Sequence, residues 1–122
     1  MGHDIYGARS EGALETAYIA GRTDQTRYPF NRPGEFPYLR YSMGNHRSHE
    51  VYEALGCTDL DGGVSGIGEG RTFTVNEIVR ARNTLAETAK DWPDWVQEQE
   101  KAFFETLLVY AEETGTAYIS FG

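Results

Sequence analysis

The strongest constraint on the fold of this chain is a pair of consecutive helix signals in its C-terminal half. Thr74 and Glu77 have the spacing of a capping box, and apolar residues recur at helical intervals after them, so a helix is predicted over about 74–90. Pro93 suits the first turn of a second helix, and Gly115 suits the C-terminal cap of that helix. The apolar stripe predicted for the second helix consists of Val96, Phe103, Phe104, Leu107, Leu108 and Ala111.

Strand signals lie on both sides of these helices. Residues 116–121 alternate in character and have strand composition, so the chain is predicted to return to a sheet at its end. The N-terminal half is less regular: its predicted elements are a first strand at Ile5 and Tyr6, a second strand over 38–42 and a short helix over 48–55 closed by Gly56. A loop is predicted between the two strands, because the prolines between residues 29 and 37 exclude a continuous helix there.

The order of these elements predicts an α+β fold. A small antiparallel or mixed sheet is expected, covered on one face by the two longer C-terminal helices and one short helix. The 122 residues, 39% of them hydrophobic, fit a single domain over 1–122.

Composition also predicts where the protein is located and whether it forms disulfides. No apolar run approaches the roughly 20 residues that cross a bilayer, and the first residues lack the pattern of a secretory signal, so a soluble cytoplasmic protein without membrane contact is expected. Cys57 is the only cysteine, which excludes an internal disulfide, and its position near a predicted helix end favours a packed thiol.

The charge is distributed unevenly along the chain. Residues 1–49 carry six arginines and five acidic residues, a net charge of +1, whereas residues 50–122 carry five basic and fourteen acidic residues, a net charge of −9. An acidic half argues against nucleic-acid binding, which needs a basic surface, and it leaves open contact with a basic patch on a partner protein. The alternative is that the acidic helices are merely solvated.

A glycine-rich run over residues 61–71 directly precedes the helix predicted at 74–90. Its backbone N–H groups are expected to form an anion-binding loop near that helix N-terminus, with Arg71 adding a positive charge. The run matches neither a Walker A loop nor a dinucleotide-binding fingerprint. The same glycines also suit a wide turn that binds nothing.

Arginine and aromatic residues alternate over residues 22–41 and supply the rest of a predicted pocket. Guanidinium groups bind phosphate or carboxylate oxygens and aromatic rings stack on bases, which is typical of a nucleotide site. The alternative is that the aromatic residues pack an irregular loop onto the core while the arginines reach solvent. The ligand-binding residues predicted from the sequence are Arg40, Arg71, Tyr38, Tyr41, Gly63, Ser65, Gly66 and Gly68.

Histidine offers a weaker candidate site. His46 and His49 are three residues apart, so they share one helical face, and Asp4 on the first strand would supply an oxygen ligand for zinc or another divalent metal. A helix-start turn explains the same residues. The sequence predicts no cofactor. It also predicts no catalytic residue, because residue order alone identifies neither a pair of acids for general acid/base catalysis nor a Ser-His-Asp or Cys-His arrangement.

Three patches of the sequence resemble small uncharacterised proteins carried by phages and bacteria. These patches are the opening Met-Gly-His-Asp-Ile-Tyr-Gly, the segment Tyr38-Leu39-Arg40 and the loop Gly-Gly-Val-Ser-Gly-Ile-Gly-Glu-Gly. Such proteins often begin with Gly-x-Asp, an aliphatic residue, an aromatic residue and Gly. The resemblance implies a phage accessory protein that counters host defences in the host cytoplasm, and it implies no activity.

Three hypotheses follow for the function. The first is a ligand-binding protein that captures a phosphate- or carboxylate-bearing, nucleotide-like molecule. The second is an acidic protein-interaction module, in which the two C-terminal helices face a basic partner or a second copy of the chain. The third is a metal-dependent enzyme that uses the histidines.

Overall fold

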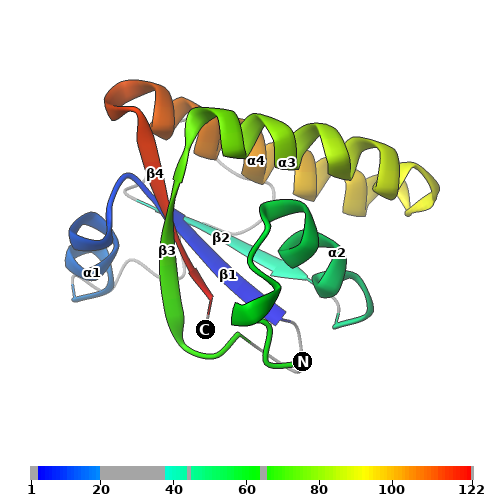
Figure 1. Ribbon diagram of the computed structural model, residues 1–122, viewed down its shortest axis with the longest axis horizontal. Helices are drawn as coiled ribbons and strands as arrows, with labels where there is room; N and C mark the ends of the chain where they lie inside the picture. Colours follow the sequence, from blue (N-terminus) through cyan, green and yellow to red (C-terminus); the bar gives the residue numbers. More distant parts are fainter. Residues whose placement is uncertain (1–2, 20–37, 44, 64–65, 122) are drawn as a thin grey trace.

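A four-stranded antiparallel sheet organises the protein (Figure 1). The computed structural model describes residues 3–19, 38–43, 45–63 and 66–121, and the strand order is β2-β1-β4-β3. The strands are β1 (His3–Ala8), β2 (Tyr38–Met43), β3 (Glu69–Thr74) and β4 (Thr116–Phe121). The helices are α1 (Glu11–Ile19), α2 (Asn45–Leu55), α3 (Val75–Thr88) and α4 (Asp94–Thr114), with short 3₁₀ turns η1 (Thr58–Leu60) and η2 (Ala89–Asp91).

The two long helices begin and end at the residues whose chemistry predicted them. The Thr74 hydroxyl accepts a hydrogen bond from the Glu77 N–H at 3.3 Å, and the Glu77 carboxylate accepts one from the Thr74 N–H at 2.9 Å, which completes the capping box of α3. Helix α4 follows Pro93 and ends at Gly115, which adopts a left-handed φ of 93°. Both predictions are confirmed.

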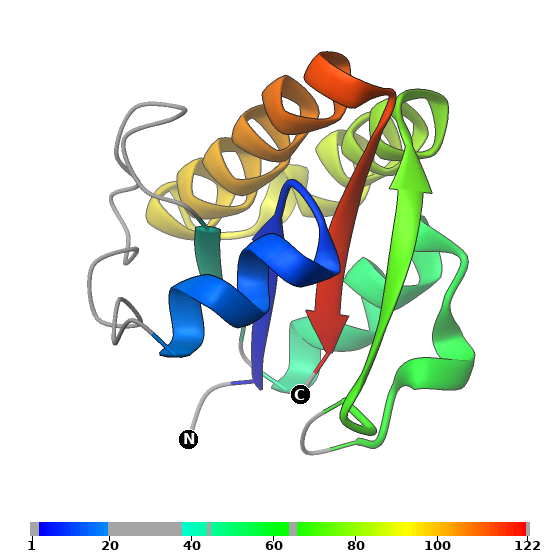
Figure 2. The same ribbon diagram turned by 90° about the vertical axis from the view of Figure 1, so that its left-hand side faces the viewer.

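Alternation along the strands gives the sheet two apolar faces. In β4, which lies between β1 and β3, Ile119 and Phe121 point into the main core, whereas Tyr118 points to the opposite face. Helices α2, α3 and α4 supply the other side of the main core, so the α+β prediction with helices on this face is confirmed (Figure 2). Its largest fully buried side chains include Tyr52, Tyr110, Phe73, Phe103, Phe104 and Phe121.

Helix α1 covers the other face of the sheet, where the sequence predicted only a loop. Figure 2 shows α1 on this face of the sheet, where Leu14 packs against Ala8 of β1 and Tyr118 of β4 in a small second cluster. Ser10 begins this helix, because its hydroxyl accepts a hydrogen bond from the Ala13 N–H at 3.1 Å. The helix is nine residues long and its one buried described side chain is Leu14, so its apolar periodicity is too weak to predict it.

Strand β3 is the second element that the sequence did not predict. It has the sequence Glu-Gly-Arg-Thr-Phe-Thr, and only Phe73 of its side chains is buried. Pairing with β4 along its whole length, from Glu69 opposite Phe121 to Thr74 opposite Thr116, makes it a strand. The glycine-rich loop therefore lies a full strand away from the N-terminus of α3, and the predicted direct connection between them is wrong.

The longest of the described helices, α4, has 21 residues. None of them is both long enough and apolar enough to cross a bilayer.

Candidate functional site

The residues predicted to form one ligand pocket lie on opposite edges of the sheet. Tyr38, Arg40 and Tyr41 belong to β2, and Arg71 belongs to β3, with β1 and β4 between the two strands. Neighbouring strands are about 4.8 Å apart, so the two backbones are separated by roughly 14 Å. Only the backbone of the β2 residues belongs to the described part of the chain, and their side chains lie outside it.

Arg71 is already paired within the protein. Its guanidinium donates two hydrogen bonds to the Asp59 carboxylate of η1, at 2.7 Å and 3.3 Å. Hydrogen bonding to Arg71 lowers the pKa of Asp59. An anion at this position would have to compete with a carboxylate that already accepts two hydrogen bonds from the guanidinium.

The glycine-rich loop uses its backbone to close on itself and on the end of β4. The Gly68 N–H donates to the Phe121 carbonyl at 2.9 Å, the Ile67 N–H donates to the Leu60 carbonyl at 3.1 Å, and the Gly63 N–H donates to the Asp61 carboxylate at 2.9 Å. These amides are therefore not oriented toward a common anion. Ser65, which the sequence also placed in the pocket, lies outside the described residues.

Steric and conformational needs explain the described glycines of this loop. A Cβ atom on Gly66 would overlap the backbone carbonyl of Phe121, and Gly63 and Gly68 have φ values of 93° and 86°. The turn interpretation of the glycine run thus accounts for these three residues without a ligand.

His49 lies at the surface between the carboxylate side chains of Glu53 and Asp61. His49 Nε2 lies 3.2 Å from a Glu53 carboxylate oxygen, and Nδ1 lies 3.7 Å from an Asp61 oxygen. The side chains of His46 and Asp4 lie outside the described part of the chain. Among the described side chains, no group of three or more His, Cys, Asp or Glu residues is arranged to hold a metal ion.

Cys57 is packed in the main core and is fully buried. Burial raises the pKa of its thiol to about 12, mainly because the charged thiolate would lose its hydration. The thiol is therefore neutral and a poor nucleophile, as expected for a structural cysteine.

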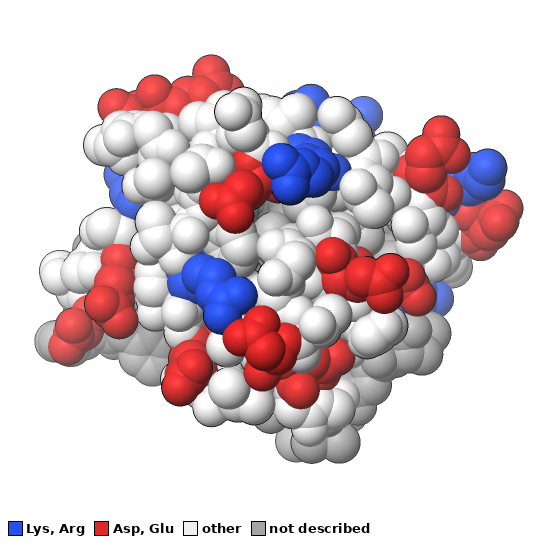
Figure 3. Space-filling view, viewed as in Figure 1, with Lys and Arg blue, Asp and Glu red and all other residues white. Residues whose placement is uncertain are grey.

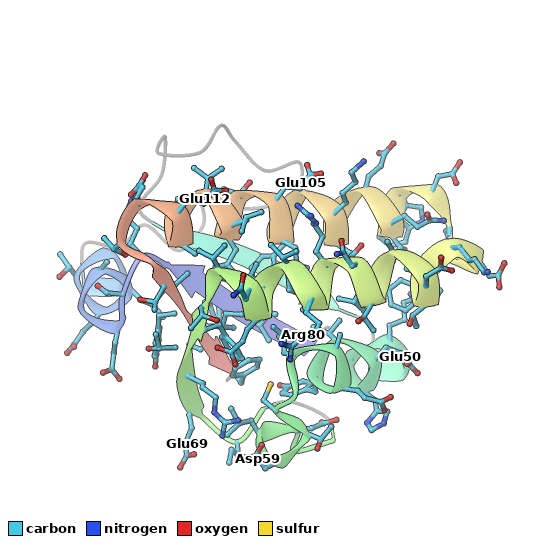
Figure 4. All side chains as sticks on the ribbon, turned by 45° about the horizontal axis from the view of Figure 1, so that its top comes forward. Glu50, Asp59, Glu69, Arg80, Glu105 and Glu112 are labelled. Carbon is cyan, nitrogen blue, oxygen red and sulfur yellow. The ribbon has the colours of Figure 1, made fainter. Side chains whose placement is uncertain are left out.

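A groove of about 460 Å³ lies between α3 and α4, and it is the site that the sequence did not identify. Figure 4 shows the two helices side by side, with Glu105 on α4, while Asp59 and Glu69 lie in a different part of the molecule. We call it the α3–α4 groove. Its lining includes two basic and four acidic residues, namely Arg82, Lys101, Asp94, Glu98, Glu100 and Glu105, together with Asn83, Gln97, Ala86 and Ala89.

Glu100 is the unusual residue of the groove. It is 4% exposed, and its Oε1 atom is sealed from solvent without a hydrogen-bond partner. Burial, and after it the negative charge of Glu105, raise the pKa of this carboxyl group to about 7, and the positive charge of Lys101 opposes the shift. A buried, unsatisfied polar atom is costly in a folded protein and is therefore expected to serve a purpose.

Gln97 also lines the groove, and its side-chain amide is anchored by two hydrogen bonds. Its side-chain nitrogen donates to the Trp92 carbonyl at 2.7 Å and to the Lys90 carbonyl at 3.3 Å. These two bonds use both N–H groups of the amide and fix its orientation, so the amide oxygen is available to accept a hydrogen bond. The groove thus offers a carboxyl group and an oriented amide.

The sequence did contain a signal for Glu100. It lies four residues after Val96 and four before Phe104, which places an acidic residue within the apolar stripe predicted for the second helix. An acid at such a position is either buried or at the edge of the core. The groove beside Glu100 depends on how α3 packs against α4. The residues next to Glu100 in the sequence do not determine this packing, so they could not predict the groove.

Searches of protein-family models, of curated proteins and of solved structures gave no significant match to this chain.

Proposed function

We propose that the protein is an interaction module that receives a basic segment of a partner protein in the α3–α4 groove. The observation that carries the proposal is the buried, unpartnered carboxyl group of Glu100 in the wall of a groove with an excess of acidic side chains. A positive charge held in the groove beside this carboxyl group would favour its ionised form.

The charge of α4 supports a partner that extends along the helix. The 21 residues of α4 include six acidic residues and one lysine, a net charge of −5. Asp94 and Glu112 are 18 residues apart, which corresponds to about 27 Å along a helix. Acidic groups over such a length suit a peptide segment with several basic residues better than a single small cation.

The charges on the surface argue against an anionic ligand in this groove. Acidic side chains are spread over the face in Figure 3, with basic side chains as separate groups between them. Arg82 and Lys101 line the groove, but the acidic lining residues outnumber them. A phosphate or carboxylate would therefore meet net repulsion before it reached either cation.

A binding measurement with a defined peptide tests the proposal. The probe is a fluorescein-labelled peptide of alternating lysine and alanine, titrated with the protein at low and moderate salt and followed by fluorescence anisotropy. We expect saturable binding that weakens with salt. The double variant Asp94→Asn/Glu105→Gln should bind about 2- to 30-fold more weakly, because each exposed charge contributes roughly 0.2 to 1 kcal/mol.

A matched variant controls for the overall negative charge. Glu15 of α1 and Glu69 of β3 are exposed and do not line the groove, so Glu15→Gln/Glu69→Gln changes the net charge equally. This variant should bind the peptide almost like the unmodified protein. An equal loss of affinity in both variants would mean that the peptide follows the net charge, and it would overturn the proposed site.

A further inference from the structure

The accessible part of the Glu100 carboxyl group is small. The residue lines the groove, yet its Oε1 atom is sealed from solvent. A group that occupies the groove can therefore approach the carboxyl group only from its other oxygen, Oε2. The geometry calls for a donor that makes one point contact.

We infer that Glu100 anchors a primary ammonium group, that of a lysine side chain, with the Gln97 amide oxygen as the second acceptor. This inference rests on the proposed function and names the chemistry of the partner at one position of the groove. The carboxylate supplies the opposite charge, and the oriented amide supplies a neutral acceptor on the preceding turn of α4.

An ammonium group fits this arrangement better than a guanidinium group. Arginine binds carboxylates with two parallel N–H donors and needs both oxygens, whereas one oxygen of Glu100 is closed off. An ammonium is a compact charge with three donors that turn to meet separate acceptors. Its slender four-carbon stem also suits a nearly buried acceptor, because Glu100 is only 4% exposed.

Binding of the ammonium is coupled to loss of a proton from Glu100. The described charged groups that line the groove with it are Arg82 from α3 and Asp94, Glu98, Lys101 and Glu105 from α4. Glu100 must be ionised to attract the ammonium, and its raised pKa of about 7 means that it carries a proton in mildly acidic solution. The lining contains no histidine among the described residues, so Glu100 is the group expected to set the pH dependence.

Nuclear magnetic resonance tests the inference directly on the intact protein. The probes are Nα-acetyl-lysine methylamide, the corresponding arginine compound and the uncharged norleucine compound, each titrated at millimolar concentration. We expect the lysine compound to shift the side-chain amide signal of Gln97 and the carboxyl carbon signal of Glu100. Its affinity should fall at least about tenfold in Glu100→Gln, and the arginine and norleucine compounds should bind at least several-fold more weakly than the lysine compound.

The pH dependence provides a readout that does not depend on any variant. In the unmodified protein the affinity for the lysine compound should fall about tenfold between about pH 8 and pH 6, because Glu100 must give up its proton. Equal binding of lysine and norleucine compounds, pH-independent binding, or unchanged affinity in a folded Glu100→Gln protein would each overturn the inference. If the lysine–alanine peptide still binds in those cases, the proposed function stands and only the Glu100 anchor fails.

Discussion

At the candidate site, the unfavourable free energy comes from burying one side chain, the carboxyl group of Glu100. Among the described residues it is the only acidic side chain that is buried. An isolated carboxylate loses its hydration when it is buried, and hydrogen bonds do not compensate for this loss at Oε1. The protein therefore tolerates a local instability at the position where a cationic group would relieve it.

The first prediction concerns the stability of Glu100→Gln. The folded-state pKa of about 7 lies above the ordinary value of 4.5, so the folded state holds the proton more tightly than the unfolded state does. The free energy of unfolding should therefore fall as the pH rises from about 4.5 to 7, and the loss should persist above that range. Glutamine removes this loss, so the variant should be more stable by about 1 to 3 kcal/mol at about pH 8 and unchanged at about pH 4.

Urea denaturation of both proteins at the two pH values checks this prediction. A variant that is less stable than the unmodified protein at the higher pH would contradict it, because Glu100 would then contribute a favourable interaction in its ionised form.

The second prediction concerns Gly66, where the chain approaches β4 too closely for a side chain. Gly66→Ala should destabilise the protein by about 2 to 3 kcal/mol, because the added Cβ would overlap the Phe121 carbonyl. Gly12 of α1 is the matched control, since a Cβ there meets nothing within 4 Å, and Gly12→Ala should be neutral or slightly stabilising. Thermal melting of the two variants separates these outcomes, and equal melting temperatures would refute the close approach.

At the scale of elements, α4 has to serve both the core and the groove. Leu107 is fully buried, and with Phe103 it fills the space over Gly7 of β1. The acidic residues of the groove lie on the same helix, so the packing of the core fixes the position of the groove wall. A rigid element of this kind is well suited to hold a binding site.

The third prediction follows from this packing. Leu107→Ala should lower the free energy of unfolding by about 2 to 5 kcal/mol, because it leaves a cavity in the main core. Val109 is 39% exposed on the same helix, and Val109→Ala should cost less than about 1 kcal/mol. Chemical denaturation measures both, and a small effect of Leu107→Ala would mean that α4 does not pack as described.

Elements with local signals could be predicted from the sequence, and elements fixed by pairing could not. The capping box of α3, the glycine cap of α4 and the alternation in β4 are each encoded within a few adjacent residues. Strand β3 depends on its partner β4, and α1 depends on a second apolar face of the sheet that no local pattern reveals. Tertiary contacts therefore decide the two elements that were not predicted.

The same distinction applies to the candidate site. The glycines of residues 61–71 predicted an anion site because they leave the backbone N–H groups accessible. Gly66 is instead required by its close approach to Phe121, a residue distant in the sequence, so this reason could not be predicted locally. Glu100 had a local signal in its position between Val96 and Phe104. Its lack of a hydrogen-bond partner emerges only when α3 packs beside α4.

At the scale of the whole molecule, the sheet separates distinct environments. Helix α1 closes one face, and α2, α3 and α4 cover the other (Figure 2). The α3–α4 groove is formed by the two helices and Ala89 of the η2 turn between them, away from Asp59 and Glu69 (Figure 4). A partner could therefore occupy the groove without disturbing the sheet.

Calorimetric titration of the protein with the lysine–alanine peptide tests the central claim most directly, in two buffers of different ionisation enthalpy at about pH 6.5. The account predicts binding with release of roughly 0.7 protons per peptide, because Glu100, with a pKa of about 7, is mostly protonated before binding and ionised afterwards. Glu100→Gln should bind more weakly and release no proton. An enthalpy that is the same in both buffers, or no binding at all, would contradict the account.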